Sequence, residues 1–264
     1  MFIDLHAHIL PDIDDGAIDV QESLAMLSMA EADHTMQIVA TPHYIAGANR
    51  YTAEGYQRLL SELQNNLRSS GRKLEVLSGH EIMLDSLSVQ HIGQGLCRTL
   101  GNSRTFLLEL PVVSTLTSVS TLLERIMDMR YHLLIAHPER YSGFSIQMWQ
   151  ELKAMGCSFQ MNAGSLAGAS GELRKRAWVL LQEGLIHVVA SDAHSPRRRA
   201  PTLSHARNLV AEHCGVEAAE LLFHENPSRI LQDMDLIIPS MKKSKKHFSI
   251  ISAFRSRHIS PVLI

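Results

Sequence analysis

The sequence predicts an α/β protein in which short strands alternate with longer helices to form a barrel. Two observations support this fold class. Seven short apolar or β-branched runs recur along the 264 residues, and stretches with helical periodicity separate them. Their spacing is that of repeated βα units, which build parallel sheets or barrels. Seven strands with this rhythm indicate a barrel related to the eight-stranded form, with functional residues at the carboxyl ends of the strands.

Each predicted element rests on a local pattern. The expected strands are Phe2–Leu5, Gln37–Thr41, Leu74–Ser78, Thr105–Leu110, His132–Ala136, Ser158–Met161 and His187–Ala190. The expected helices are Gln21–Asp33, Ala53–Ser69, Ser118–Arg130, Ile146–Met155, Glu172–Glu183, Thr202–His213, Glu217–Phe223 and Pro227–Asp233. Asp19 and Glu22 make an acid-rich start for the first helix, and Gly71 and Gly184 follow helical runs as stop signals.

The composition is that of a soluble globular protein. Apolar residues make up 45% of the chain and charged residues 20%. The three cysteines are far apart and form no CxxC pair, which argues against a disulfide framework and fits a reducing compartment. No apolar run reaches the roughly 18 residues of a membrane span, and Asp4 interrupts the run where a signal peptide would need continuous apolar residues. We therefore expect a cytoplasmic protein.

Charge divides the chain into a body and a tail. Residues 240–264 carry six Lys or Arg residues and no acid, whereas the rest of the chain is net acidic. An acidic body does not favour nucleic-acid binding. We expect one domain over residues 1–239 and a flexible basic tail over 240–264. The alternative is a membrane-surface element at the inner face of the membrane, with lysines on anionic lipid and Phe248, Ile251 and Phe254 inserted.

Histidines and carboxylates follow the predicted strands where each one ends. His6 and His8 share one face at the end of the first strand, because alternate side chains of a strand point the same way. Further clusters are Asp14–Asp15–Gly16, Thr41–Pro42–His43, Gly79–His80–Glu81, Leu107–Pro111 with Glu109, His137–Arg140 and Ser191–His194. Singly, the histidine pair is equally typical of surface residues and Asp-Asp-Gly of a turn. Together, their placement favours one shared site.

These clusters contain ligands that divalent metals prefer. The candidate ligands are His6, His8, Asp15, His43, Glu81, Glu109, His137, Asp192 and His194. Nine imidazole and carboxylate groups exceed the needs of one tetrahedral ion, and no thiolate of a structural zinc site is among them. They suit two or three ions with a bridging carboxylate. Such ligands accept Mn, Fe, Zn or Co, so the residues leave the metal open.

The ordered motifs HxH, DDG, TPH, GxE, LLELP, HPER and SDAH resemble the PHP superfamily of polymerase and histidinol-phosphatase domains. More narrowly, they resemble the bacterial manganese-dependent tyrosine-protein phosphatases of capsular and exopolysaccharide operons. The similarity extends from Met1 to about Asp233. It implies a distorted seven-stranded (β/α) barrel, similar to a TIM barrel, with three metal ions, manganese first among the candidates, at the carboxyl ends of the strands.

The resemblance also implies roles for individual residues. One ion would be held by His6, His8, Glu109 and Asp192, a second by Glu109 and His137, and a third by Asp15, His43, Glu81 and His194. Arg140 of HPER and Arg199 after SDAH would face the substrate phosphate, although Arg197 and Arg198 are neighbouring alternatives for the second position.

The implied activity is hydrolysis of phosphotyrosine, on a membrane-associated tyrosine kinase that controls polysaccharide synthesis. Three alternatives remain open on the sequence. The first is a histidinol-phosphate phosphatase or another small-molecule phosphoesterase of the superfamily. The second is a metal-dependent amidohydrolase, which the pairing of Asp192 with His194 disfavours. The third is a non-enzymatic assembly factor. The oligomeric state is also open, and a homo-oligomer is compatible with the sequence.

Overall fold

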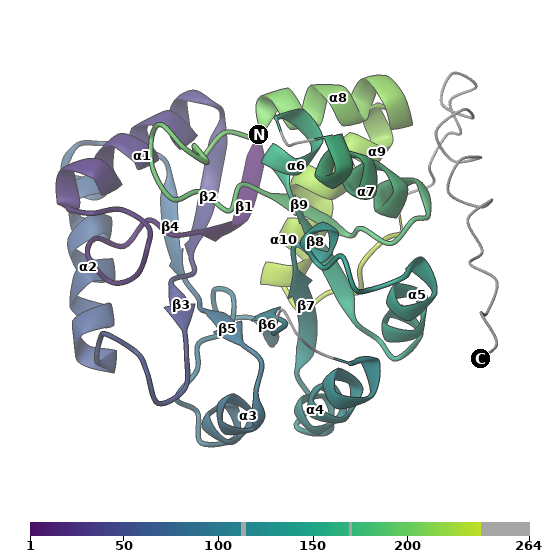
Figure 1. The fold of residues 1–264 in the computed structure, drawn as a ribbon. Helices are drawn as coiled ribbons and strands as arrows, with labels where there is room; N and C mark the ends of the chain where they lie inside the picture. The colour runs from purple at the N-terminus through teal and green to yellow at the C-terminus, as the bar shows by residue number, and fades with distance from the viewer. Residues whose placement is uncertain (112–114, 169–170, 239–264) are drawn as a thin grey trace, which may run out of the picture.

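Parallel strands form the centre of the molecule, and helices surround them (Figure 1). The computed structural model describes residues 1–111, 115–168 and 171–238. One sheet has the order β1-β2-β4, and the other has the order β3-β5-β6-β7-β8-β9. The strands are β1 (Phe2–Ala7), β2 (Thr35–Ala40), β3 (His43–Tyr44), β4 (Glu75–Ser78), β5 (Glu81–Met83), β6 (Thr105–Glu109), β7 (His132–Ala136), β8 (Ser158–Asn162) and β9 (Val188–Ala190).

The seven predicted strands are present, and β3 and β5 are two short additions. Each addition continues a predicted strand after a two-residue break, β2 into β3 across Thr41–Pro42 and β4 into β5 across Gly79–His80. The Glu81 backbone N–H donates to the Pro42 carbonyl at 3.1 Å, so the two breaks lie side by side. Proline donates no hydrogen bond to a ladder, and a Cβ on Gly79 would lie 2.7 Å from Val39 Cγ1. At these residues both strand segments leave the three-stranded sheet and enter the six-stranded one.

The ring of strands meets itself between β9 and β1, but the barrel is not closed by a continuous ladder. The Asp192 N–H donates to the His6 carbonyl at 2.8 Å, and the His8 N–H donates to the Ala193 carbonyl at 2.8 Å. Asp4 accepts from the Ser191 N–H at 2.9 Å. This seam lies just beyond the carboxyl end of β9, and it is where the predicted ligands of both strands sit. The predicted (β/α)7 barrel is therefore confirmed in a distorted form.

The helices cover the outer faces of the strands. They are α1 (Val20–Ala32), α2 (Ala53–Ser69), α3 (Ser86–Gly93), α4 (Leu116–Asp128), α5 (Ile146–Ala154), α6 (Ala163–Ala167), α7 (Gly171–Gln182), α8 (Ser204–Cys214), α9 (Val216–Glu220) and α10 (Asn226–Leu231), with a 3-10 turn Pro138–Arg140 and a π turn Leu221–Glu225. Figure 1 shows α1 and α2 beside the three-stranded sheet, with α3, α4 and α5 along the six-stranded one. The eight predicted helices are present, and α3 and α6 are two helices that the sequence analysis does not predict.

Local signals explain where several helices begin and end. The Asp19 side chain accepts from the Glu22 N–H at 2.8 Å and caps α1, as its position in the sequence indicates. Gly71 and Gly184 follow α2 and α7 with φ of 68° and 65°, a conformation that favours glycine. The short helix α3 begins at Asp85, which forms a capping box with Ser88.

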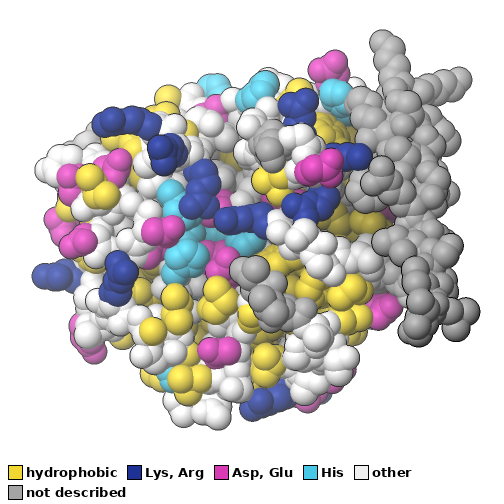
Figure 2. All heavy atoms as spheres, in the orientation of Figure 1, with side chains coloured by type: hydrophobic (Ala, Val, Ile, Leu, Met, Phe, Trp, Pro, Cys, Tyr) yellow, Lys and Arg dark blue, Asp and Glu magenta, His cyan; other side chains and the backbone are white. Residues whose placement is uncertain are grey.

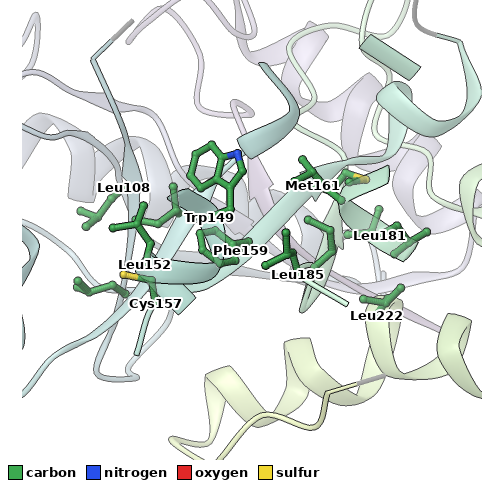
Figure 3. Packing of buried hydrophobic residues seen from close by; sticks show 14 of the residues in the cluster. Leu108, Trp149, Leu152, Cys157, Phe159, Met161, Leu181, Leu185 and Leu222 are labelled. Carbon is green, nitrogen blue, oxygen red and sulfur yellow. The ribbon is translucent and has the colours of Figure 1, made fainter. Parts of the chain in front are cut away.

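The largest apolar core lies between the six-stranded sheet and its helices. Trp149 and Leu152 of α5 pack over Phe159 and Met161 of β8, and all four side chains are buried (Figure 3). Burial of such side chains stabilises the fold by roughly 1.5–3 kcal/mol each. This packing holds the strands rigidly, so their carboxyl ends have defined positions.

The predicted basic tail lies outside the described residues. Among the residues that the structure describes, no helix is both long enough and apolar enough to cross a bilayer.

The Tyr56 hydroxyl joins the two strand breaks, and its removal is expected to destabilise the fold. Its Oη accepts from the Gly79 N–H at 3.0 Å and lies 3.3 Å from the Ala40 carbonyl. Tyr56→Phe leaves this buried N–H without an acceptor and should lower the free energy of unfolding by about 1–3 kcal/mol. Denaturant unfolding measures this, with Tyr131→Phe as the control because that hydroxyl has no partner among the described residues. Equal stability of the two variants would contradict the prediction.

Candidate metal centre

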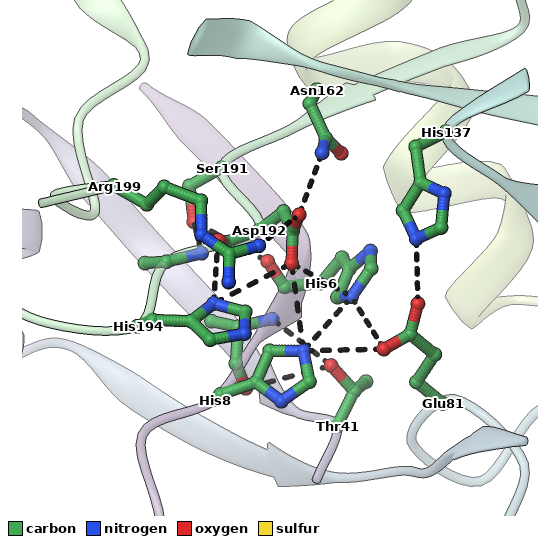
Figure 4. A network of polar contacts seen from close by, with 12 residues as sticks. His6, His8, Thr41, Glu81, His137, Asn162, Ser191, Asp192, His194 and Arg199 are labelled. Atoms are coloured by element: carbon green, nitrogen blue, oxygen red, sulfur yellow. Dashed lines mark hydrogen bonds and ion pairs between the residues drawn. The ribbon is translucent and has the colours of Figure 1, made fainter. Parts of the chain in front are cut away.

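The structure brings all nine predicted ligands together at the carboxyl ends of the strands. They are His6 and His8 from β1 and its loop, Asp15 from the same loop, His43 from β3, Glu81 from β5, Glu109 from β6, His137 after β7, and Asp192 and His194 after β9. Figure 4 shows His6, His8, Glu81, Asp192 and His194 converging on one small volume. Their order in the site follows the order of the strands around the ring.

Glu81 lies at the centre of the cluster. Its Oε2 is 3.4 Å from His6 Nε2 and 3.3 Å from His8 Nε2, and its Oε1 is 2.8 Å from His137 Nε2. His43 Nδ1 also approaches Oε2, at 2.9 Å. The side chain is fully buried, and its Oε2 makes no hydrogen bond within the part of the chain that the structure describes. One carboxylate therefore faces four imidazoles.

A second group lies toward the surface. Asp15 Oδ1 is 3.4 Å from His43 Nε2 and 3.3 Å from His194 Nε2. The His8 and His194 rings are 4.0 Å apart between centroids, so this group adjoins the deeper one. Ligand atoms of His8, Asp15, His43 and His194 lie within 4.8 Å of one another, close enough to share an ion.

The structure exchanges the places of the two glutamates in the division implied by the resemblance. Glu81, and not Glu109, contacts His6 and His8. Glu109 lies on the other side of Glu81, 3.8 Å from His137 and 3.9 Å from His43. The reason is the extra strand β5, which begins at Glu81 and turns that side chain into the centre of the site. Glu81 thus contacts His6, His8 and His137, and it also reaches His43 of the outer group.

Asp192 links the ligands to the two predicted arginines. Its Oδ1 lies 3.3 Å from His6 Nε2, and its Oδ2 accepts from Arg199 Nη1 at 2.8 Å. Arg140 Nη1 is 3.5 Å from the same oxygen. The two guanidinium side chains are 47% and 41% exposed, so they stand at the mouth of the site. Among the three consecutive arginines, Arg199 is the one that contacts a ligand carboxylate.

Three residues outside the predicted ligand set hold the candidate ligands in place. Asp14 Oδ2 is 2.7 Å from His8 Nδ1, and Gln160 Oε1 is 2.9 Å from His6 Nδ1. Asn162 donates to Asp192 Oδ2 at 2.6 Å. Partners of this kind fix the orientation and tautomer of a ligating side chain. A signal existed for two of them, because Gln160 and Asn162 share one face of β8, the one predicted strand without a candidate ligand.

Two ligands have a backbone conformation that is uncommon for residues other than glycine. His137 has φ of 35° and Asp192 has φ of 52°. Each follows the end of a strand, β7 or β9, and each side chain points into the site (Figure 4). Such strained residues persist where the surrounding structure determines them, and they concentrate at functional sites.

The carboxylates of the cluster raise the pKa of two of its imidazoles. Burial opposes protonation of His8, but the carboxylates of Asp14, Asp192 and Glu81 outweigh it and raise the pKa well above its usual value. For His43, burial is likewise outweighed by Asp15 and Glu81, which raise the pKa to about 10. The His8 and His43 rings would thus carry protons that balance the buried carboxylates. A divalent cation would balance the same charge, so the donor set and the imidazole nitrogens around Glu81 Oε2 fit bound metal.

The site opens on one face of the molecule. Figure 2 shows histidine and acidic side chains grouped at the centre of that face, with Lys or Arg side chains directly beside them. The outer ligand Asp15 is 60% exposed, whereas Glu81 is completely buried. A substrate therefore reaches the cluster from the side of the arginines and Asp15.

Comparison with known proteins identifies the family. Residues 2–232 match the family described as capsular polysaccharide synthesis, CpsB/CapC. The chain belongs to this family. The tyrosine-protein phosphatase CpsB of Streptococcus pneumoniae is 30% identical over 239 residues, which cover 88% of this chain and 98% of that protein. The tyrosine-protein phosphatase YwqE of Bacillus subtilis is 30% identical over 251 residues, covering 93% and 98%.

Solved structures agree with the CpsB/CapC assignment. A chain from the crystal structures of YwqE and CpsB, described as unique metal-dependent tyrosine phosphatases, superposes with a TM-score of 0.84 at 29% identity. It covers 92% of this chain and 100% of its own length. A dihydroorotase matches with a TM-score of 0.51 at 14% identity, which shows a shared fold alone.

Metal affinity is expected to depend on Asp14. Asp14 Oδ2 contacts His8 Nδ1 at 2.7 Å and accepts from the His43 N–H at 3.0 Å, while Oδ1 accepts from the Gly16 N–H at 2.9 Å. Asp14→Asn removes the negative charge and replaces one of these two acceptors with a donor. The affinity for Mn²⁺ should fall about 10- to 100-fold in isothermal titration of the metal-free protein. Asp12→Asn is the matched control, because Asp12 is exposed in the same loop and its side chain has no partner among the described residues. Unchanged affinity in Asp14→Asn would contradict this role.

Metal affinity is also expected to rise with pH. Because the carboxylates raise the pKa of His43 to about 10, its ring holds a proton at neutral pH that a metal must displace. The apparent affinity for Mn²⁺ should therefore increase from pH 6 to pH 9, with release of protons on binding. Titration in buffers of different ionisation enthalpy measures both quantities. An affinity that is constant or falls over this range would show that the imidazoles are not the ligands.

Proposed function

We propose that the protein is a metal-dependent phosphatase that hydrolyses phosphotyrosine in proteins. The observation that carries the proposal is the pair Arg140 and Arg199 at the mouth of a cluster of imidazoles and carboxylates. Guanidinium groups beside metal ligands favour a substrate with several anionic oxygens, as in a phosphate monoester. Relatives of the same family that share about 30% identity are named tyrosine-protein phosphatases.

The contacts within the site support three groups of ligands. We assign His6, His8, Glu81 and Asp192 to a first ion, and Glu81, Glu109 and His137 to a second. His8 already turns one nitrogen to Asp14, so the third, outer ion is assigned to Asp15, His43 and His194. In this proposal Glu81 bridges the first two ions. Manganese, iron, zinc and cobalt all fit these nitrogen and oxygen ligands.

The metal ligands and the two arginines have different roles in the proposed hydrolysis. Bound divalent ions would supply a water of lowered pKa and positive charge for the phosphoryl oxygens. Arg199 now pairs with Asp192 at 2.8 Å, and its exposed guanidinium can turn to bind the phosphoryl group together with Arg140. The two arginines orient the phosphorus toward the deeper ligands and compensate charge in the transition state. The phenolate of tyrosine is a tolerable leaving group, because the phenol has a pKa of about 10, and we assign no residue as its general acid.

The family supports an inference about the substrate. Its members take part in capsular polysaccharide synthesis, and the relatives are named tyrosine-protein phosphatases. We infer that the physiological substrate is a phosphotyrosine protein of that system, a membrane-associated tyrosine kinase. The histidinol-phosphate alternative has no support among the relatives, and the amidohydrolase alternative shares the fold alone.

Turnover is expected to depend on His137. His137→Ala removes the imidazole that lies 2.8 Å from Glu81 and should abolish hydrolysis of p-nitrophenyl phosphate and of a phosphotyrosine peptide. His132→Ala is the matched control, because His132 is exposed at the opposite end of the same strand. Initial rates with added Mn²⁺, and after removal of metal with a chelator, measure the effect. Wild-type rates in His137→Ala would refute the proposed centre, and a preference for histidinol phosphate would refute the substrate.

We further propose that residues 1–239 form the catalytic unit and that the basic tail contacts anionic membranes. The tail carries six Lys or Arg residues and no acid, and each such residue near an anionic surface contributes about 1 kcal/mol. The full chain should co-sediment with phosphatidylserine vesicles at low salt, while a chain ending at Pro239 should stay in solution. Neutral vesicles are the control. Equal partitioning of the two chains would end this proposal.

A further inference from the structure

A cavity of about 600 Å³ lies behind the strand breaks. It is bounded by Tyr51 and Tyr56 at the start of α2, by His80 in the β4–β5 break and by the loop from Gly95 to Asn102. None of its lining residues belongs to the proposed metal ligands or arginines. Its volume is in the range, roughly 300–1,000 Å³, of cavities that bind small molecules.

The lining carries one positive charge and no negative one. Arg98 is the single Lys or Arg among the described residues of the lining, which include no Asp or Glu. Its guanidinium carbon lies 4.5 Å from the centroid of the Tyr56 ring, and it makes no ion pair with any residue that the structure describes. A half-buried guanidinium without a carboxylate partner is an available site for an anion.

A buried donor in the same wall also lacks a partner. His80 is 3% exposed, and its Nδ1 accepts the Arg98 backbone N–H at 3.1 Å. The neutral ring must then carry its proton on Nε2, and this N–H has no acceptor among the described residues. Tyr44 stacks on the ring at 4.9 Å and fixes its orientation. Unpaired buried donors are uncommon in folded proteins and call for an explanation.

We propose that this cavity binds a small hydroxyl-rich molecule that carries a phosphoryl or sulfuryl anion, as a phosphorylated sugar does. The anion pairs with Arg98, and the His80 ring forms part of the wall against which the ligand packs. Neutral hydrogen-bonding groups of Asn49, Thr99 and Asn102 line the rest of the cavity and match hydroxyl groups. The proposal stands on the cavity alone and does not depend on the proposed phosphatase activity.

A molecule bound in this cavity would contact residues that adjoin His43 and Glu81, two of the proposed metal ligands. The Tyr51 hydroxyl donates to the His43 carbonyl at 2.9 Å, and His80 directly precedes Glu81. Both Tyr51 and His80 line the cavity. Binding therefore stabilises the β3 and β5 segments from the side opposite to the metal centre, and it raises the melting temperature of the protein.

The test uses glucose 6-sulfate, an ester that a phosphatase does not hydrolyse. Isothermal titration of the full-length, metal-loaded protein is compared with Arg98→Gln and with Arg174→Gln, a control that removes an exposed arginine on α7. Loss of the charged partner should weaken binding about 10-fold or more in Arg98→Gln, with wild-type affinity in Arg174→Gln. Hydrolysis of p-nitrophenyl phosphate should be unchanged in Arg98→Gln, which separates this cavity from the metal centre.

Two further probes separate the parts of the ligand. Inorganic sulfate should bind more weakly than the ester, and glucose should not bind detectably. Asn102→Ala should lower the affinity for the ester and leave the affinity for inorganic sulfate unchanged. Equal affinity of wild type and Arg98→Gln for the ester, or no binding by wild type, would overturn the proposal. Equal affinity of sulfate and the ester would overturn its sugar component.

Discussion

The site is organised by the burial of one carboxylate. Glu81 has no exposure to solvent, and an ionised carboxylate in such a place is very unfavourable unless cations or hydrogen bonds compensate it. Imidazoles of His6, His8 and His137 surround it at 2.8 to 3.4 Å. Protons or metal ions must supply the compensating charge. The positions of the neighbouring strand ends follow from this requirement, because each contributes a group that shares the charge.

The barrel is distorted where it carries the most ligands. Without the breaks, β2 and β4 would continue as regular strands. The direction of the Glu81 side chain would then be set by the alternation of side chains along β4. The breaks at Pro42 and Gly79 start new strands at His43 and Glu81, and the Tyr56 hydroxyl holds both breaks together. The opposite side of the ring is a short seam in which β1 and the end of β9 exchange backbone hydrogen bonds. Irregular backbone thus lies on both sides of the cluster, and the regular strands β6, β7 and β8 form the rigid remainder.

Much of the fold could be predicted because the pattern of apolar runs follows from burial. The central strands are buried on both faces, so they appear as continuous apolar runs, and α2 was predicted at its observed bounds. The strand additions β3 and β5 are two and three residues long, too short for any periodicity to appear. For the same reason α6, with five residues, left no pattern.

The membership of the candidate site could be predicted better than its internal arrangement. Nine ligand-type residues at strand ends converge because the carboxyl ends of parallel strands meet at one edge. The pairing of Glu81 with His6 and His8 depends on the strand break, and Pro42 and Gly79 mark the two breaks in the sequence without indicating where the Glu81 side chain then points. The supporting residues Asp14 and Gln160 are ordinary polar residues in the sequence, and contacts between distant strands give them their role.

The absence of sulfur from the cluster has a consequence for the protein's response to oxidants. Cys157 and Cys214 are buried in the apolar core, and Cys97 lies in the wall of the cavity that contains Arg98. Phosphatases that use a thiolate nucleophile lose activity when peroxide converts it to sulfenic acid. Imidazole and carboxylate groups do not undergo that reaction. The same chemistry therefore becomes dependent on the supply of metal in the cell instead of on the redox state of a cysteine.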